Sequence, residues 1–155
     1  MKKILFVEDQ THLKLDVLFD WFKLKNIDVE YEIVGSISEA KRYLFNKSNK
    51  VDLVITDLGL PWFKGERVTN LLEGIAIVYD MWEFNTEVTV IINSTTVIPN
   101  FERIKEDYEE RGQQLYKVDS IMEIKEWLMD FLMSWFLKRI LDNFLGFFLY
   151  VNYIM

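Results

Sequence analysis

The sequence predicts an α/β protein built on a five-stranded parallel sheet. Short runs of residues that favour strands alternate along the chain with longer segments of helical period. Two of the short runs are almost entirely apolar, Ile4-Leu-Phe-Val7 and Val88-Thr-Val-Ile-Ile92. Such strands are typical of the centre of a parallel sheet, where helices cover both faces. The alternation therefore indicates strand–helix–strand crossovers.

Five strands and five helices follow from these patterns. We expect strands at residues 3–7, 29–34, 51–56, 88–92 and 114–116. Apolar residues at helical spacing predict a first helix at residues 13–24. Further helices are expected from residue 36, from residue 65 to 82, at residues 102–111 between Pro99 and Gly112, and from residue 120. Ser36 and Ser120 each precede a glutamate by three positions, which is the spacing of a capping box at a helix start.

Composition narrows the class of protein. The chain has 155 residues, of which half are hydrophobic and 28% are charged, so one globular domain is the expected organisation. It contains no cysteine, which excludes a disulfide framework and a thiolate metal site. The net charge of -7 argues against nucleic-acid binding, because phosphate neutralisation requires clustered lysine and arginine. The first apolar run is too short for a signal peptide, so we expect a cytoplasmic protein.

Three carboxylates follow two of the predicted strands directly. Glu8 and Asp9 come after the first strand, and Asp57 comes after the third. In an open parallel sheet the functional crevice lies beyond the carboxyl ends of the strands, so these acids should meet there. Crowded like charges are stable when a cation lies among them, and Mg²⁺ prefers oxygen ligands. The sequence therefore predicts a magnesium site.

The fourth and fifth strands are followed by groups of a different kind. Ser94 follows the fourth strand, with Thr95 as the alternative hydroxyl, and Lys117 follows the fifth. A hydroxyl donor and an ammonium beside a metal site suit an anionic phosphoryl group. Phosphoryl chemistry is therefore the predicted activity of this edge.

These motifs together resemble a known family. The set Glu8-Asp9, Asp57-Leu-Gly-Leu-Pro61, Gly65, Ser94 and Lys117 resembles, in order and spacing, the response-regulator receiver domain of the CheY-like family over residues 1–134. The resemblance implies a doubly wound, flavodoxin-like fold with strand order 2-1-3-4-5. It also implies an aspartate that a histidine kinase or phosphotransfer protein phosphorylates.

The resemblance implies a role for each matching residue at the acidic edge. Asp57 would be the phosphoacceptor and a magnesium ligand. Asp9 would bind Mg²⁺ directly, Glu8 would bind it through water, and the carbonyl of Gly59 would add a further ligand. The product, an aspartyl phosphate, would carry roughly two negative charges.

The resemblance also implies that Ser94 holds a phosphoryl oxygen and that Lys117 pairs with the phosphoryl group. Ser94 comes 37 residues after Asp57. This gap exceeds the usual spacing of the family by about two helical turns. We expect the extra residues to extend the third helix around residues 74–82.

The last predicted helix is longer than one small sheet can cover. Paired apolar residues recur from Trp127 to Leu145, just before Gly146. The resemblance implies a receiver domain at residues 1–134, so we expect an apolar helical extension at 135–155. Homodimerisation through this helix is the first interpretation, and docking on its own domain is the second. The uncharged run of 13 residues from 143 to 155 is short of the roughly 20 residues that span a bilayer, although it can lie in a membrane interface.

Three functions remain open at this stage. The first is a single-domain response regulator without a DNA-binding effector, which is not an enzyme beyond its own phosphorylation and dephosphorylation. The second is a phosphorylation-independent interaction module that uses the long last helix. The third, a Mg²⁺-dependent phosphatase or phosphotransferase, has no second nucleophile or general acid in the sequence.

Overall fold

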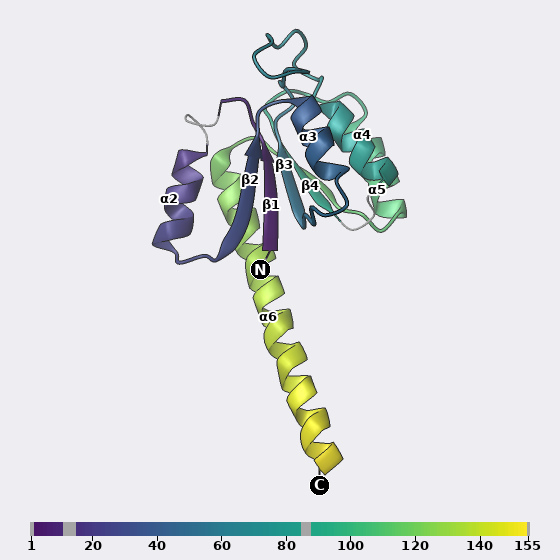
Figure 1. Ribbon diagram of the computed structural model, residues 1–155. Helices are drawn as coiled ribbons and strands as arrows, with labels where there is room; N and C mark the ends of the chain where they lie inside the picture. The colour runs from purple at the N-terminus through teal and green to yellow at the C-terminus, as the bar shows by residue number, and fades with distance from the viewer. Residues whose placement is uncertain (1, 11–14, 85–87, 155) are drawn as a thin grey trace. The chain divides into compact units, whose positions relative to one another are not determined.

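The computed structural model describes residues 2–10, 15–84 and 88–154. Ten elements alternate along these residues (Figure 1). The strands are β1 (Lys2–Val7), β2 (Val29–Val34), β3 (Leu53–Thr56), β4 (Thr89–Asn93) and β5 (Leu115–Val118). The helices are α2 (Asp16–Leu24), α3 (Ile37–Leu44), α4 (Ile75–Phe84), α5 (Phe101–Glu110) and α6 (Ile121–Ile154).

The strands form one parallel sheet in the order β2-β1-β3-β4-β5. This is the doubly wound order that the sequence resemblance implied, and it is confirmed. Val7 at the end of β1 stands opposite Val34 of β2 and Thr56 of β3. The carboxyl ends of these three strands are therefore level with one another.

Helices cover the sheet on both faces. Successive side chains of a strand point to opposite sides, so each strand contributes apolar side chains to both layers. Leu5 and Val7 of β1 belong to a buried apolar cluster that contains residues of α3, α4 and α5. Phe6, between them, points to the other face, where its ring centroid lies 5.5 Å from that of Phe19 in α2. Figure 1 shows α3, α4 and α5 on one side of the sheet and α2 on the other. The near-continuous apolar run of β1 is explained by this two-sided burial.

The predicted capping box at Ser36 is present. The hydroxyl oxygen of Ser36 accepts a hydrogen bond from the backbone N–H of Glu39 at 3.3 Å. In return the Glu39 carboxylate accepts from the Gly35 N–H at 3.0 Å. Two backbone donors at the start of α3 are thereby satisfied, which fixes where the chain turns from β2 into the helix.

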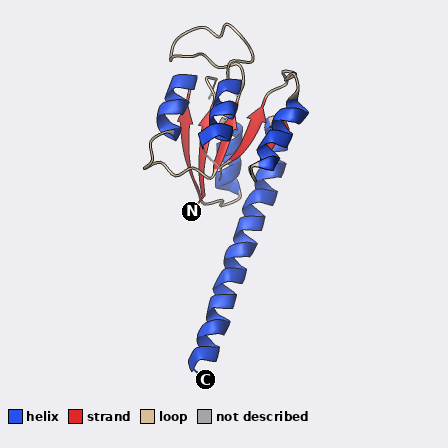
Figure 2. Ribbon diagram, turned by 90° about the vertical axis from the view of Figure 1, so that its right-hand side faces the viewer, coloured by secondary structure: helices blue, strands red, loops and turns tan. Residues whose placement is uncertain are grey.

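The third helix differs from its prediction. We expected a helix from residue 65 to 82, but α4 begins at Ile75, and residues 62–74 form an irregular loop. Gly65 has a φ of +86°, which is outside the helical region, and the Asn70 side chain accepts from the Leu72 N–H at 2.9 Å. Such local side-chain bonds compete with helix formation. The extra residues between Asp57 and Ser94 therefore lie largely in this loop, which projects beyond the carboxyl ends of the strands (Figure 2).

Several element limits also differ by a few residues. β3 begins at Leu53 rather than residue 51, and β5 spans Leu115–Val118 rather than 114–116. The predicted start of the first helix at residue 13 lies outside the described residues. The shift in β5 matters most, because it moves Lys117 from the end of the strand into the strand.

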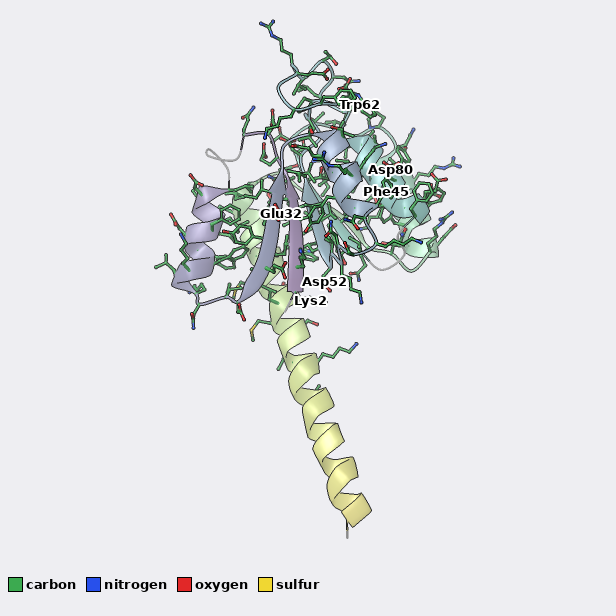
Figure 3. The ribbon with its side chains drawn as sticks, in the orientation of Figure 1. Lys2, Glu32, Phe45, Asp52, Trp62 and Asp80 are labelled. Carbon is green, nitrogen blue, oxygen red and sulfur yellow. The ribbon has the colours of Figure 1, made fainter. Side chains whose placement is uncertain are left out.

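An ion pair links β1 to the segment before β3 at the amino ends of these strands. The ammonium of Lys2 lies 2.8 Å from a carboxylate oxygen of Asp52, whose other oxygen accepts from the Lys3 N–H at 2.8 Å. Figure 3 shows Lys2 and Asp52 together, at the end of the sheet opposite to Trp62. This pair joins β1 to the residue before β3 and lies away from the three predicted metal-binding acids.

The chain divides into two compact units, residues 1–121 and 122–155. The described residues of the second unit all belong to α6, one continuous helix of 34 residues that begins at Ile121, after the predicted cap Ser120, and continues past Gly146. Within it the rings of Trp127 and Phe131 stack with centroids 5.0 Å apart. No helix in the described part of the chain has the length and apolarity that a bilayer crossing requires.

Candidate functional site

Three predicted metal-binding acids lie together at the carboxyl edge of the sheet. Glu8 and Asp9 follow β1, and Asp57 follows β3, its immediate neighbour in the sheet. One carboxylate oxygen of each residue lies within 4.8 Å of the others. The parallel pairing of β1 and β3 produces this convergence, since it brings both strand ends to the same edge.

Hydrogen bonds from the backbone hold two of these acids in place. The Glu8 side chain is buried, at 3% exposure, and accepts from the Gln10 N–H at 3.0 Å. Asp57 is half-buried, and its Oδ1 accepts from the N–H of Leu58 at 2.6 Å and of Gly59 at 3.3 Å. Its own N–H donates to the carbonyl of Val7 at 2.9 Å. The carboxylate of Asp57 is thus oriented by the loop that it begins.

The arrangement fits a divalent cation with a preference for oxygen. Three carboxylates within 4.8 Å of one another repel when all are ionised, and one of them is buried. A cation among them removes this repulsion, and carboxylate and carbonyl oxygens are the ligands that Mg²⁺ takes. Gly59, whose carbonyl is the fourth predicted ligand, lines the same cavity as Asp57. The donor set therefore fits Mg²⁺.

Asp57 opens into a cavity of about 580 Å³ at this edge. Ser94, the predicted phosphoryl-binding hydroxyl, lines the cavity, and so does its alternative Thr95. The N–H of Ser94 donates to the carbonyl of Val118 at 3.0 Å, and its Oγ accepts from the Thr96 N–H at 3.2 Å. The cavity is lined by Gln10, Val17, Asp57, Gly59, Val68, Leu71, Asn93, Ser94, Thr95, Thr96, Asp119, Ser120 and Ile121.

Lys117 is placed differently from the prediction. We expected it directly after the fifth strand, but it lies within β5, which ends at Val118. Its ammonium donates to a carboxylate oxygen of Asp119. Asp119 lines the cavity, whereas Lys117 is not among the described lining residues. The lysine is therefore held beside the cavity by an acid that the sequence analysis did not select.

Gly74 is a further residue that the sequence analysis did not assign to the site. Its N–H donates to the carbonyl of Leu58 at 2.8 Å. A Cβ atom at this position would lie 2.5 Å from the carbonyl oxygen of Asp57 and 2.7 Å from the Cα of Leu58. The backbone before α4 therefore packs directly on the backbone of the candidate phosphoacceptor, and a residue with a side chain does not fit there without a shift.

The two missed residues differ in whether the sequence contains a signal for them. Asp119 could have been found by the same reasoning that selected Asp57, since it is an acid directly after a strand once β5 is extended to Val118. Gly74 gave no such signal, because its requirement arises from a contact with Leu58, which is far away in sequence. Val68 and Leu71 likewise reach the cavity from a loop that was predicted to be helical.

Known structures resemble this chain along most of its length. The chain is similar to the signal receiver domain of an HD domain-containing protein from Pseudomonas fluorescens, with a TM-score of 0.55 and 18% identity, over 86% of this chain and 95% of that one. It is also similar to the phosphorylated cyanobacterial phytochrome response regulator RcpA, with a TM-score of 0.54 and 21% identity, over 86% of this chain and 94% of that one.

No protein-family model matches the sequence, and no curated protein matches it significantly. The similarity is therefore one of fold at low sequence identity. The chain has the receiver-domain fold, with a five-stranded sheet in the order 2-1-3-4-5. This is the fold that the resemblance in sequence motifs implied.

Proposed function

We propose that this protein is a response regulator in which Asp57 accepts a phosphoryl group in a Mg²⁺-dependent reaction. The observation that carries the proposal is the convergence of Glu8, Asp9 and Asp57 within 4.8 Å, beside a cavity that Asp57 shares with Ser94. Acids from two strands and a hydroxyl from a third are what a carboxylate nucleophile requires to receive a phosphoryl group. One of the similar structures is described as a signal receiver domain and the other as a phosphorylated response regulator, which supports the same assignment.

Each residue has a distinct part in the proposed reaction. A carboxylate oxygen of Asp57 attacks the phosphorus, so that an oxygen–phosphorus bond forms as the bond from phosphorus to the donor breaks, and the donor leaves with that electron pair. Mg²⁺, when bound by Glu8, Asp9, Asp57 and the Gly59 carbonyl, would neutralise charge on the phosphoryl oxygens. The Leu58 and Gly59 N–H groups orient Asp57.

Two side chains complete the proposed reaction on the phosphoryl side. The hydroxyl of Ser94 donates to a phosphoryl oxygen, and Lys117 supplies a positive charge once it leaves Asp119. Catalysis is then mainly positioning and charge neutralisation. We assign no enzymatic activity beyond phosphorylation and dephosphorylation of this aspartate.

The partners in this proposal follow from the reaction. A histidine kinase or a phosphotransfer protein supplies the phosphoryl group in the cytoplasm. Nucleic acid is not a partner in this proposal, because the net charge of -7 opposes binding to phosphate backbones.

A small phosphodonor tests the proposal directly. The full chain is incubated with Mg²⁺ and acetyl phosphate, and the intact mass is measured. We expect one phosphoryl group that is lost on treatment with base or hydroxylamine, as an acyl phosphate is. Asp57→Asn should abolish it, whereas Asp28→Asn, an equal charge change at an exposed residue remote in sequence, should not. Absence of incorporation from acetyl phosphate and from histidine kinases would contradict the proposal.

A second candidate function uses α6 as an interaction surface, independently of phosphorylation. Three apolar side chains four residues apart, Met133, Leu137 and Leu141, are each at least half exposed. Residues at this spacing lie along one side of a helix. We propose that a second copy of the chain covers this apolar helix as a homodimer, since an exposed apolar stripe of this kind marks an interaction surface. Dimerisation that is unchanged by Asp57→Asn and by acetyl phosphate would favour this function over the first.

A further inference from the structure

We propose that Asp119 is a positioning residue that holds Lys117 outside the acidic cavity until a phosphoryl group on Asp57 draws the lysine in. The inference rests on the proposed function, because it requires a phosphoryl group at Asp57. It gives a role to the ion pair that the receiver-like motif did not contain. Asp119 is thereby a competitor for the one lysine of the motif.

The geometry places the competing acid on the cavity wall. The Lys117 ammonium is bonded to Asp119, and Asp119 lines the same cavity as Asp57 and Ser94. The Lys117 side chain is 19% exposed, whereas the Asp119 side chain is 62% exposed. The partner that holds the lysine is thus the more exposed side chain of the two.

The charges favour an exchange once Asp57 is phosphorylated. The phosphoryl group adds roughly two negative charges and three acceptor oxygens, whereas Asp119 offers one charge that water screens. An exposed ion pair contributes little net free energy, so little opposes its separation. The lysine stem has rotatable bonds along its length, which allow the ammonium to move between two acceptors.

The exchange has a consequence beyond the cavity. Asp119 and Ser120 directly precede α6, and both line the cavity together with Ile121, the first residue of that helix. When Lys117 moves to the phosphoryl group, the charge on Asp119 is no longer balanced by the lysine. The phosphorylation site and the start of α6 are therefore linked through one ion pair.

The resting pair is tested without any phosphoryl group. Acylation of Lys117 by an amine-reactive reagent is followed by mass spectrometry in the full-length wild type and in Asp119→Asn. We expect the ion pair to slow acylation, so that the rate at Lys117 rises in Asp119→Asn. Glu110→Gln, which changes the net charge equally on the exposed face of α5, is the matched control and should leave the rate unchanged.

The exchange itself is tested with beryllofluoride, an analogue of the phosphoryl group, in the presence of Mg²⁺. Without its competitor, Lys117 should bind the analogue more readily. The affinity of Asp119→Asn should therefore rise about 1.4- to fivefold, the fold-change that corresponds to the free energy of an exposed ion pair. Removal of a negative charge near the cavity would also attract an anion in general. The same substitution is therefore made in a Lys117→Ala background, where the part of the increase that depends on the lysine should disappear.

Each result has a defined meaning. An increased acylation rate together with a gain in affinity that depends on Lys117 supports the proposal. An unchanged acylation rate overturns it, because the pair would then be absent. A gain that persists undiminished in Lys117→Ala, or no gain while binding still requires Asp57, also overturns it. If neither the wild type nor any variant binds the analogue or accepts phosphate, the proposed function fails and this inference fails with it. Slower acylation of Lys117 in the wild type than in Asp119→Asn would then show that the ion pair exists and that the proposed function is the part that is wrong.

Discussion

Gly74 shows how closely a single residue can constrain the candidate site. Its backbone lies against Asp57 and Leu58, and a Cβ atom would come within 2.5 Å of the Asp57 carbonyl oxygen. We expect Gly74→Ala to lower the free energy of unfolding by about 2 kcal/mol, because the overpacked atoms are backbone atoms that do not rotate away. Urea unfolding of the wild type and the variant measures this difference. Phosphorylation from acetyl phosphate should slow in the same variant, since the displaced backbone carries Asp57, the proposed acceptor.

Gly59→Ala is the matched control for that measurement. The nearest atom to a Cβ at Gly59 is the Leu71 Cδ2 at 3.6 Å, an ordinary contact with a side chain. Its stability should change by less than about 0.5 kcal/mol. Equal effects at the two glycines would contradict the role of Gly74 and would indicate that backbone entropy alone accounts for the loss.

The effect of Asp9→Asn on the free energy of unfolding should depend on whether Mg²⁺ is present. Glu8, Asp9 and Asp57 repel one another when no cation is bound, so Asp9→Asn should raise the free energy of unfolding by about 0.5–1 kcal/mol in metal-free buffer. In saturating Mg²⁺ the wild type should gain stability from binding, and the variant should gain less, because it has lost a ligand. Thermal unfolding with EDTA and with Mg²⁺ measures both effects. A variant that is equally stabilised by Mg²⁺ would show that Asp9 is not a ligand.

At the same scale, the sequence predicted where most of the candidate site residues lie, but not how all of them are paired. Glu8, Asp9, Asp57 and Ser94 lie where the rule of strand ends puts them, because that rule needs the strand order and little else. The partner of Lys117 was missed because the fifth strand was ended two residues early, at residue 116 instead of Val118. Strand limits depend on backbone pairing with β4, which local residue preference does not contain.

At the scale of elements, the segment between β3 and α4 is where local preference and structure diverge. The expected third helix begins at about Gly65 and includes residues 65–74. The structure instead uses the Leu72 N–H for a bond to the Asn70 side chain and the Gly74 N–H for a bond to the Leu58 carbonyl. The second bond joins residues 16 positions apart, and a sequence pattern cannot indicate it.

Tyr108 connects α5 to α4 by a hydrogen bond and makes the stability of the fold depend on pH. The Tyr108 side chain is buried, and its hydroxyl donates to the carbonyl of Val78. Burial raises the pKa of the Tyr108 phenol well above its usual value near 10. The native state therefore keeps the phenol neutral while the unfolded chain ionises, so the free energy of unfolding should fall as pH rises above about 10.

Tyr108→Phe tests this connection. The variant should lose about 1 kcal/mol near neutral pH, because the Val78 carbonyl loses its hydrogen bond from the tyrosine. It should also lose less stability than the wild type between pH 9 and about 11, since the titrating group is gone. Chemical unfolding over this pH range gives both values. Tyr79→Phe, at an exposed tyrosine of α4, should leave stability near neutral pH unchanged, and equal slopes above pH 10 for wild type and Tyr108→Phe would refute the assignment.

At the scale of the whole molecule, the sheet could be predicted from the sequence, but the surface that covers the last helix could not. The alternation of elements, the two apolar strands and the spacing of the motif residues all pointed to one parallel sheet, and the order β2-β1-β3-β4-β5 agrees. The division between a receiver domain and an extension at residue 135 stays a prediction, while the structure separates residues 1–121 from 122–155. A helix can be predicted from its own residues, but the surface that covers it belongs to another part of the molecule or to another molecule.

The exposed apolar residues of α6 lead to the last prediction. If a second copy covers this helix, the stripe formed by Met133, Leu137 and Leu141 lies in the interface. A glutamate introduced there would be buried without a partner, so Met133→Glu combined with Leu137→Glu should weaken dimerisation roughly tenfold or more. Light scattering and sedimentation over a concentration series measure the dissociation constant, and circular dichroism checks that the helix remains. Ser134→Glu, which adds a charge at an exposed polar position of the same helix, should leave the constant nearly unchanged. A wild type that stays monomeric at every concentration, or a double variant that dimerises as tightly as the wild type, would show that this stripe is not a dimer interface.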